Sequence, residues 1–305
     1  MQYTKYQLLS TFIFSIITCY IYAQPVLPVS ISDSIAPIKE LQNTELQVIL
    51  ETEICSNPKW NTLVNKEKMS LGIVDLSNIN DIRYAGLNDD FMMYAASLPK
   101  IAILLTAMDA LENGELTDSK EIQNDLRLMI SKSNNKASTR MIDRLGYEKI
   151  ESVLRGSKNK LYDEEVGGGL WVGKRYAAGG KRYPEPMKGL SHAATTRQVC
   201  SFYYQLVMGN LVSTERSRQM LDIMKNPGLH HKFVNTLDKI APKADLYRKS
   251  GSWKNYHSDS VLVWGPKRRY IIVALIEDSY GEQIIRDLVI PLEKVLKKSR
   301  LMVSR

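Results

Sequence analysis

The distribution of strand and helix patterns along the 305 residues limits the folds available to this chain. Runs typical of β-strands occur at residues 70–76 and 81–86 and again between residues 245 and 277, whereas most of the intervening sequence has helical periodicity. The simplest single core is one sheet assembled from both ends of the chain and backed by terminal helices, with the middle helices forming a second lobe.

We therefore expect one domain over residues 39–305. Its sheet lobe would contain residues 39–96 and 245–305, and its helical lobe residues 97–244. The composition agrees with a globular protein that has a sizeable core, because 44% of the residues are hydrophobic and 24% are charged.

The first 23 residues have a different character. Lys5 precedes an apolar run that ends at Ala23, which is typical of a secretory signal peptide cleaved after a small residue. An uncleaved anchor is the alternative, although the run is short for a bilayer span, and Cys19 lacks a good lipoprotein context. Residues 24–38 contain three prolines and would form an irregular leader. We expect a periplasmic or secreted protein without membrane insertion after signal removal.

The net charge alone excludes no kind of binding partner. The formal charge of +8 becomes +7 when Lys5 is removed with the signal, and no long basic block is present. Without aromatic residues interleaved among basic ones, we expect no nucleic-acid partner, and the basic surface suits anionic envelope polymers or acidic substrates.

Cysteine and histidine give weaker constraints. Cys55 and Cys200 would remain in the mature chain, as one disulfide or as two buried thiols. The histidines show no metal-ligand spacing, so we expect neither a metal nor another cofactor. They are His192, His230, His231 and His257.

A buried helix is expected to begin at Ser97. Pro99 suits a first helical turn, the apolar residues between 101 and 111 recur at helical spacing, and Asn113-Gly114 is a stop signal. Serine is a favoured helix cap, and capping alone explains its presence. The apolar sequence before it nevertheless predicts that this helix N-terminus is buried.

A second interpretation of Ser97 is chemical. Lys100 lies within one turn on the same helical face. Apolar walls and the positive end of a helix favour the neutral form of a lysine, and a neutral amine can take the proton of a hydroxyl. Ser97 would then be a nucleophile and Lys100 its base.

Two more short motifs and a glycine-rich segment follow. Ser133-Asn-Asn135 interrupts a helical region, where these residue types favour a bend, and Lys249-Ser-Gly251 lies in a predicted strand. Alone, each fits an ordinary turn or a strand with a bulge. Residues 161–190 carry glycines and prolines throughout and should form a long loop, a type that is often functional.

In this order, Ser97-x-x-Lys100, Ser133-Asn-Asn135 and Lys249-Ser-Gly251 resemble the motifs of the serine β-lactamase and penicillin-binding protein superfamily. The order of elements from about residue 40 to 298 is most similar to class A β-lactamases. The resemblance implies a mixed α/β (α+β) fold, in which an antiparallel five-stranded sheet is flanked by helices and carries an inserted all-helical lobe.

The resemblance also implies catalytic roles. Ser97 would attack a carbonyl carbon and become acylated, with Lys100 as the proton acceptor. Ser133 would pass a proton to the leaving nitrogen, and Lys249 would face the substrate carboxylate.

Substrate binding would use residues next to these. The amides of Ser97 and Ser252 would form an oxyanion hole, and Asn135 would hold the substrate amide. Ser250 replaces the threonine that is usual in the family, and Gly251 would let the backbone approach closely.

The glycine-rich segment departs from the resemblance. It contains no Glu-x-x-Leu-Asn, whose glutamate activates the deacylating water in class A enzymes. Glu185 is flanked by two prolines and is the best substitute, with Glu164, Glu165 and His192 as alternatives. The favoured interpretation is nevertheless that these acids face solvent in a loop and that His192 is a structural residue at a helix start. Three aromatic residues could line a ligand pocket or pack beneath the loop: Trp171, Tyr176 and Tyr183.

We therefore predict an exported, monomeric serine hydrolase that acts on small molecules, β-lactams or similar peptidoglycan peptides, through a Ser97 acyl-enzyme. One alternative is a penicillin-binding DD-peptidase or another amide or ester hydrolase with slow deacylation. Another is a non-catalytic binding protein of the cell envelope.

Overall fold

The computed structural model describes residues 26–29 and 35–303. The expected signal peptide and part of the expected leader lie outside the described residues. No helix within the described residues combines the length and the apolar character needed to cross a membrane.

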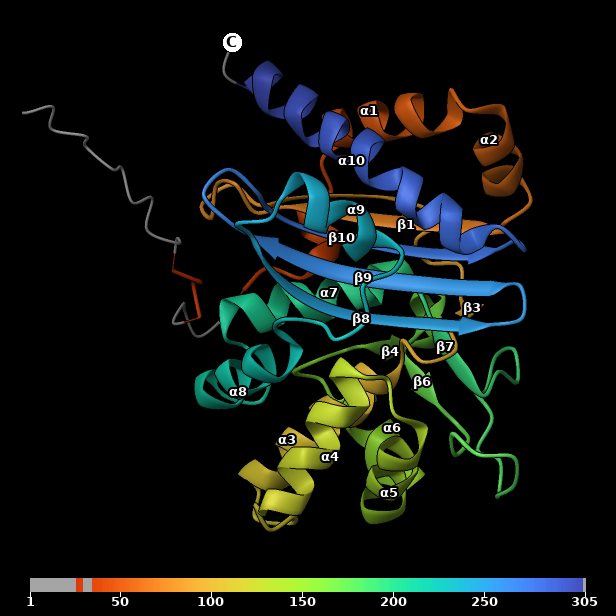
Figure 1. The fold of residues 1–305 in the computed structure, drawn as a ribbon, viewed down its shortest axis with the longest axis vertical. Helices are drawn as coiled ribbons and strands as arrows, with labels where there is room; N and C mark the ends of the chain where they lie inside the picture. Colours follow the sequence, from red (N-terminus) through yellow and green to blue (C-terminus); the bar gives the residue numbers. More distant parts are fainter. Residues whose placement is uncertain (1–25, 30–34, 304–305) are drawn as a thin grey trace, which may run out of the picture.

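The central element within the described residues is a five-stranded sheet with the order β2-β1-β10-β9-β8 (Figure 1). Every neighbouring pair is antiparallel, and β10 joins the two ends of the chain because it pairs with β1 on one side and β9 on the other. The prediction of an antiparallel five-stranded sheet is confirmed. The strands are β1 (Met69–Asp75), β2 (Arg83–Leu87), β8 (Asp245–Trp253), β9 (Tyr256–Trp264) and β10 (Arg269–Glu277).

One face of the sheet is covered by helices from the two ends of the chain (Figure 1). Asn43 and Asn57 cap the first two of these helices, and Pro58 occupies the start of the second. The helices are α1 (Thr44–Cys55), α2 (Pro58–Asn65), α9 (Phe233–Ile240) and α10 (Gly281–Val303). Because α9 packs with this apolar cluster, the sheet lobe also takes residues from before the expected boundary at 245.

The opposite face packs against α7 (Thr196–Met208), which approaches β1 closely. A Cβ added at Gly72 would lie 2.7 Å from Sγ of Cys200, so this contact requires glycine. Both Cys55 and Cys200 are free thiols, and only Cys200 is fully buried, so the structure contains neither a disulfide between them nor two buried thiols.

The helical lobe lies beyond α7 and continues the same apolar cluster (Figure 1). It consists of α3 (Lys100–Glu112), α4 (Lys120–Ser131), α5 (Asn135–Leu145), α6 (Tyr147–Arg155) and α8 (Thr214–Met224). The helix expected from Ser97 begins at Lys100 instead. The amides of Lys100 and Ile101 bond to carbonyls three residues back, so Ser97 lies in a tighter turn before the helix.

The glycine-rich segment contains short pairings that periodicity does not predict. In a three-stranded sheet, β7 (His192–Ala194) pairs with β3 (Met93–Tyr94) and β6 (Trp171–Val172). These pairings attach the segment to the chain just before Ser97. The remaining short elements are the turns Ile38–Leu41 and Glu164–Val166 and the pair β4 (Tyr162–Asp163) and β5 (Gly168–Gly169).

Candidate active site

Ser97 lies in the turn that links β3 to α3. The residue before it, Ala96, has φ +50°, a left-handed conformation that is uncommon for residues other than glycine. Ser97 is partly exposed and lines a cavity of about 740 Å³, to which Asn135, Tyr176 and Ser252 also contribute. The turn therefore places a serine hydroxyl at a cavity between the two lobes.

Gly251 brings strand β8 against this turn. A Cβ at Gly251 would lie 2.5 Å from the Ser97 nitrogen and 2.4 Å from the Ala95 carbonyl oxygen, so no other residue fits without moving backbone. The hydroxyl of Ser258 on β9 donates to the same Ala95 carbonyl at 2.8 Å. The sheet and the turn that contains Ser97 are therefore held in direct contact, and the residue after Gly251, Ser252, lines the cavity.

Lys100 is completely buried at the first position of α3, a helix whose other residues are almost all apolar. Its Nζ donates to the Ser133 carbonyl at 2.7 Å and to Asn135 Oδ1 at 2.8 Å, and it lies 3.4 Å from Ser133 Oγ. Burial lowers the pKa of Lys100 from 10.5 to about 7. A large fraction of this amine is therefore neutral near pH 7 and can accept a proton.

Ser133 occupies the bend between α4 and α5 with φ +54°. The next residue, Asn134, ends the bend because its side chain accepts the Ala137 amide and caps α5. Lys249 Nζ donates to Ser133 Oγ at 3.0 Å, so this hydroxyl lies between two lysine amines. Such a position suits proton transfer between a lysine and a substrate.

Lys249 is buried in β8 and also donates to the Ser250 carbonyl at 2.6 Å. Burial, together with the nearby charge of Lys100, holds the pKa of Lys249 well below its usual value. Because an anion placed beside this amine would favour its charged form, Lys249 can bind a carboxylate while taking up a proton.

The predicted residues Ser250 and Ser252 occupy different environments. Ser252 lines the cavity, whereas Ser250 is buried and its hydroxyl lies 3.5 Å from Nε2 of His231. The structure therefore brings Ser97, Lys100, Ser133, Asn135, Lys249, Gly251 and Ser252 to one place, with Ser250 directed toward the neighbouring His231.

Lys232 is part of this region although no sequence motif marks it. Its buried Nζ donates to the Gly251 carbonyl at 2.5 Å, to Ser252 Oγ at 2.7 Å and to the Ser258 carbonyl at 3.0 Å. Burial lowers its pKa from 10.5 to about 8. Lys232 therefore holds in place the segment of β8, Gly251 and Ser252, that lies against the Ser97 turn. In the sequence this lysine simply precedes the apolar start of α9.

Glu185 does not fit the deacylating role suggested by the resemblance. Its buried carboxylate accepts hydrogen bonds from the Tyr162 hydroxyl and from the amides of Met187 (2.8 Å) and Lys188 (2.6 Å). Of the described residues that line the Ser97 cavity, none is an aspartate or glutamate. The structure thus shows Glu185 as the internal cap of its loop, because its carboxylate accepts the amides of the two residues that follow Pro186.

Of the alternatives to Glu185, only His192 lines the cavity. Glu164 and Glu165 are exposed, and Glu164 pairs with Arg155 at 2.7 Å. His192 does line the cavity, but its Nε2 donates to the Lys174 carbonyl at 3.0 Å and its Nδ1 accepts from the Ser191 hydroxyl at 3.2 Å. Burial lowers the pKa of His192 to about 4, so the ring is neutral and both nitrogens are occupied.

Tyr176 covers Lys100 from the glycine-rich segment. Its ring centroid lies 4.4 Å from Lys100 Nζ, its hydroxyl donates to the Ala96 carbonyl at 3.2 Å, and its ring is 4.3 Å from that of His192. Trp171 and Tyr183 instead stack on each other with centroids 5.8 Å apart, outside the cavity lining. Of the three aromatic residues considered, only Tyr176 belongs to the site.

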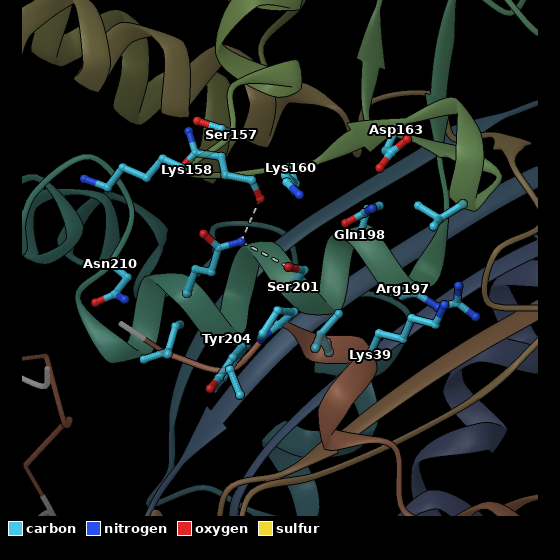
Figure 2. A pocket seen from close by; sticks show the side chains of 17 residues that line it. Lys39, Ser157, Lys158, Lys160, Asp163, Arg197, Gln198, Ser201, Tyr204 and Asn210 are labelled. Atoms are coloured by element: carbon cyan, nitrogen blue, oxygen red, sulfur yellow. Dashed lines mark hydrogen bonds between the residues drawn. The ribbon is translucent and has the colours of Figure 1, made fainter. Parts of the chain in front are cut away.

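A second cavity of about 490 Å³ lies between residues 35–39, the segment around residues 157–166 and α7. Figure 2 shows the side chains that line this cavity, apolar as well as polar. Gln205 donates to Ser201 Oγ and to the Asn159 carbonyl, both at 3.0 Å. None of the residues in the three motifs lines it. The Ser97 cavity, by contrast, is lined by Ser97 and Asn135 of the motifs and by Ser252.

Comparisons with known proteins agree with this architecture. A search of curated protein sequences finds no significant match. Among solved structures, the β-lactamase from Sphaerobacter thermophilus DSM 20745 superposes with a TM-score of 0.63 at 16% identity, covering 82% of this chain and 97% of that one.

Two further structures have the same fold. The ancestral class A β-lactamase of the last common ancestor of Gram-negative bacteria gives a TM-score of 0.58 at 15% identity, covering 81% of this chain and 98% of that one. The structure of PBP-A gives 0.60 at 19% identity, covering 84% of this chain and 97% of that one. The family model described as the β-lactamase enzyme family matches residues 58–290. With its sheet, its lobes and this match over most of its length, the chain belongs to the β-lactamase enzyme family, a family of hydrolases.

Proposed function

We propose that the protein is an exported serine hydrolase that reacts with β-lactams through an acyl-enzyme on Ser97. The observation that carries the proposal is the position of Ser133 Oγ, within 3.4 Å of Lys100 Nζ and 3.0 Å of Lys249 Nζ, in a region where Gly251 contacts the Ser97 turn. A hydroxyl nucleophile, a neutral amine, a proton-transferring hydroxyl and a carboxylate-binding amine are together sufficient for acyl transfer.

In the first step, the Ser97 oxygen attacks the carbonyl carbon and its proton passes to the neutral Lys100 amine. The negative oxygen that develops would be held by the amides of Ser97 and Ser252, and donors of this kind contribute about 3 to 4 kcal/mol each. When the C–N bond breaks, the nitrogen takes the proton of Ser133, and Ser133 recovers a proton from Lys100, which had taken it from Ser97. The products are an ester on Ser97 and an amine on the opened ring.

Hydrolysis of this ester needs an activated water. No carboxylate lines the cavity among the described residues, and the two nitrogens of His192 are already engaged. These observations favour slow deacylation, so a penicillin-binding peptidase or another amide or ester hydrolase is the second candidate. In both cases the same residues form the acyl-enzyme.

Intact-mass analysis over time with benzylpenicillin tests the proposal. We expect an adduct of one penicillin on the wild-type protein and none on Ser97→Ala. Ser191→Ala is the matched control, since Ser191 lines the same cavity and, within the described part of the chain, its hydroxyl bonds only to His192. A transient adduct would indicate a β-lactamase and a persistent one a penicillin-binding protein. An unmodified wild-type protein would refute the proposal and favour a non-catalytic binding protein.

A further inference from the structure

The cavity at Ser97 carries positive charge on more than one wall. Lys174 and Arg175 line it from the segment after β6, and Lys254 lines it from the turn between β8 and β9. No acidic side chain is present among the described residues of the lining. An excess of one sign in a concave site favours ligands of the opposite sign and concentrates them there.

Lys254 occupies a position where lysine is unexpected. Trp253 pairs with Tyr256 across the hairpin, which leaves Lys254 and Asn255 as a two-residue loop. Lys254 has φ +51°, and the first position of such a loop favours glycine when its φ is positive. A lysine with a positive φ at the edge of a cavity points to a function for its charge.

Lys174 is positioned by contacts on both sides. Its carbonyl accepts the Nε2 proton of the buried His192, and the adjacent Arg175 pairs with Asp143 of α5 at 2.6 Å. Because Asp143 neutralises Arg175, the charge that remains available on this wall is that of Lys174. Neither Lys174 nor Lys254 forms an ion pair with any residue of the described ranges 26–29 and 35–303.

The site thus has two positively charged regions that could each bind an anionic group. Lys249 lies deep, beside Ser133, and suits the carboxylate next to the reacting amide. Lys174 and Lys254 line the cavity from the segment after β6 and from the β8–β9 hairpin. A ligand that carries a second carboxylate can therefore use both regions at once.

Resting on the proposed function, we propose that Lys174 and Lys254 form a second anion subsite, which selects acyl donors that bear a carboxylate in addition to the one facing Lys249. Among β-lactams, the preferred class is dianionic. Among peptides, the preferred class would carry an additional side-chain carboxylate.

The test compares benzylpenicillin with its α-carboxy derivative, which differs by one carboxylate. The second-order rate constant for acylation of Ser97 is measured by mass spectrometry at low and high salt. We expect a preference of about tenfold for the dianion at low salt, which decreases at high salt because the charges are screened. The double variant Lys174→Gln/Lys254→Gln should abolish this preference and still react with benzylpenicillin.

Two controls separate charge from structure. Lys267→Gln removes an exposed lysine outside the cavity lining and should leave the preference unchanged. Lys254→Gly suits the turn but lacks the charge, so it should fold normally and lose part of the preference, whereas Lys254→Arg should keep it. Equal rates for the two penicillins, or a preference that survives in the double variant, would overturn the subsite while the acyl-enzyme stands. If neither penicillin acylates Ser97, both proposals fail.

Discussion

The pKa of Lys100 should be adjustable through Asn135, because Asn135 Oδ1 lies 2.8 Å from Lys100 Nζ. Asn135→Asp replaces the amide with a carboxylate of nearly the same shape and puts a negative charge beside the amine. The charged form of Lys100 is then favoured, and its ability to accept the Ser97 proton at neutral pH decreases.

The size of the effect follows from the unperturbed site. With a pKa of about 7, roughly half of Lys100 is neutral at pH 7, against roughly one molecule in 3,000 for an ordinary lysine at 10.5. A carboxylate at this distance raises a pKa by about 1 to 3, which places Lys100 between about 8 and 10. The neutral fraction at pH 7, and acylation with it, would fall about 5- to 500-fold. Because Asn135 is exposed, solvent screening favours the lower part of this range.

The assay is the pH dependence of acylation by benzylpenicillin, followed by stopped-flow fluorescence or quenched-flow mass spectrometry. In the wild type we expect the rate to rise with pH, with a midpoint near 7, and then to level off. Asn135→Asp should move the midpoint to higher pH, whereas Asn135→Ser, which loses the amide without adding charge, should lower only the plateau. If the aspartate variant keeps the wild-type midpoint, Lys100 is not the base.

Four further outcomes are expected. Gly251→Ala should slow acylation about 100-fold, because the added Cβ forces strand β8 away from the Ser97 turn. Rapid-mixing kinetics measure this rate, and an unchanged rate would show that the close approach of β8 to Ser97 is not required. Lys232→Met should lower the free energy of unfolding by about 1 to 3 kcal/mol in urea titrations, because two buried carbonyls lose their donor. Glu185→Gln should leave the lifetime of the acyl-enzyme unchanged while weakening its loop, measured by mass spectrometry and hydrogen exchange, and a longer lifetime would restore its deacylating role. The pKa of His192 is lowered from 6.5 to about 4, so between these pH values only the unfolded chain binds the proton. The free energy of unfolding should therefore decrease by about 3 kcal/mol as the pH is lowered from 6.5 to 4, and His192→Gln should reduce this decrease in urea titrations.

The sequence predicts the sheet and most helices because their periodic patterns are long. The strand runs at 70–76 and 245–277 and the helical periods between them correspond to β1, β8 to β10 and α3 to α8. The short strands β3, β6 and β7 are not predicted, since two or three residues carry no measurable period and their pairing depends on tertiary contact.

The candidate site is predictable where motif residues carry the contacts. Lys100, Ser133 and Lys249, which the motifs single out, lie in contact in the structure. Lys232 is not predictable, because its importance comes from carbonyls of β8 and β9 that a local pattern does not reveal. The position of Glu185 is hidden for a similar reason, because the Tyr162 hydroxyl, 23 residues earlier in the chain, helps to hold its carboxylate inside the loop.

The pairing of β1 with β10 has a consequence for biosynthesis. A ribosome must complete residue 277 before β1 receives its second neighbour, and Gly251 reaches the Ser97 turn only after β8 has been made. A nascent chain therefore carries its serine for about half of translation without the strand that completes the pocket. On the proposed function, a fluorescent penicillin should therefore leave unlabelled any fragment that ends before β8.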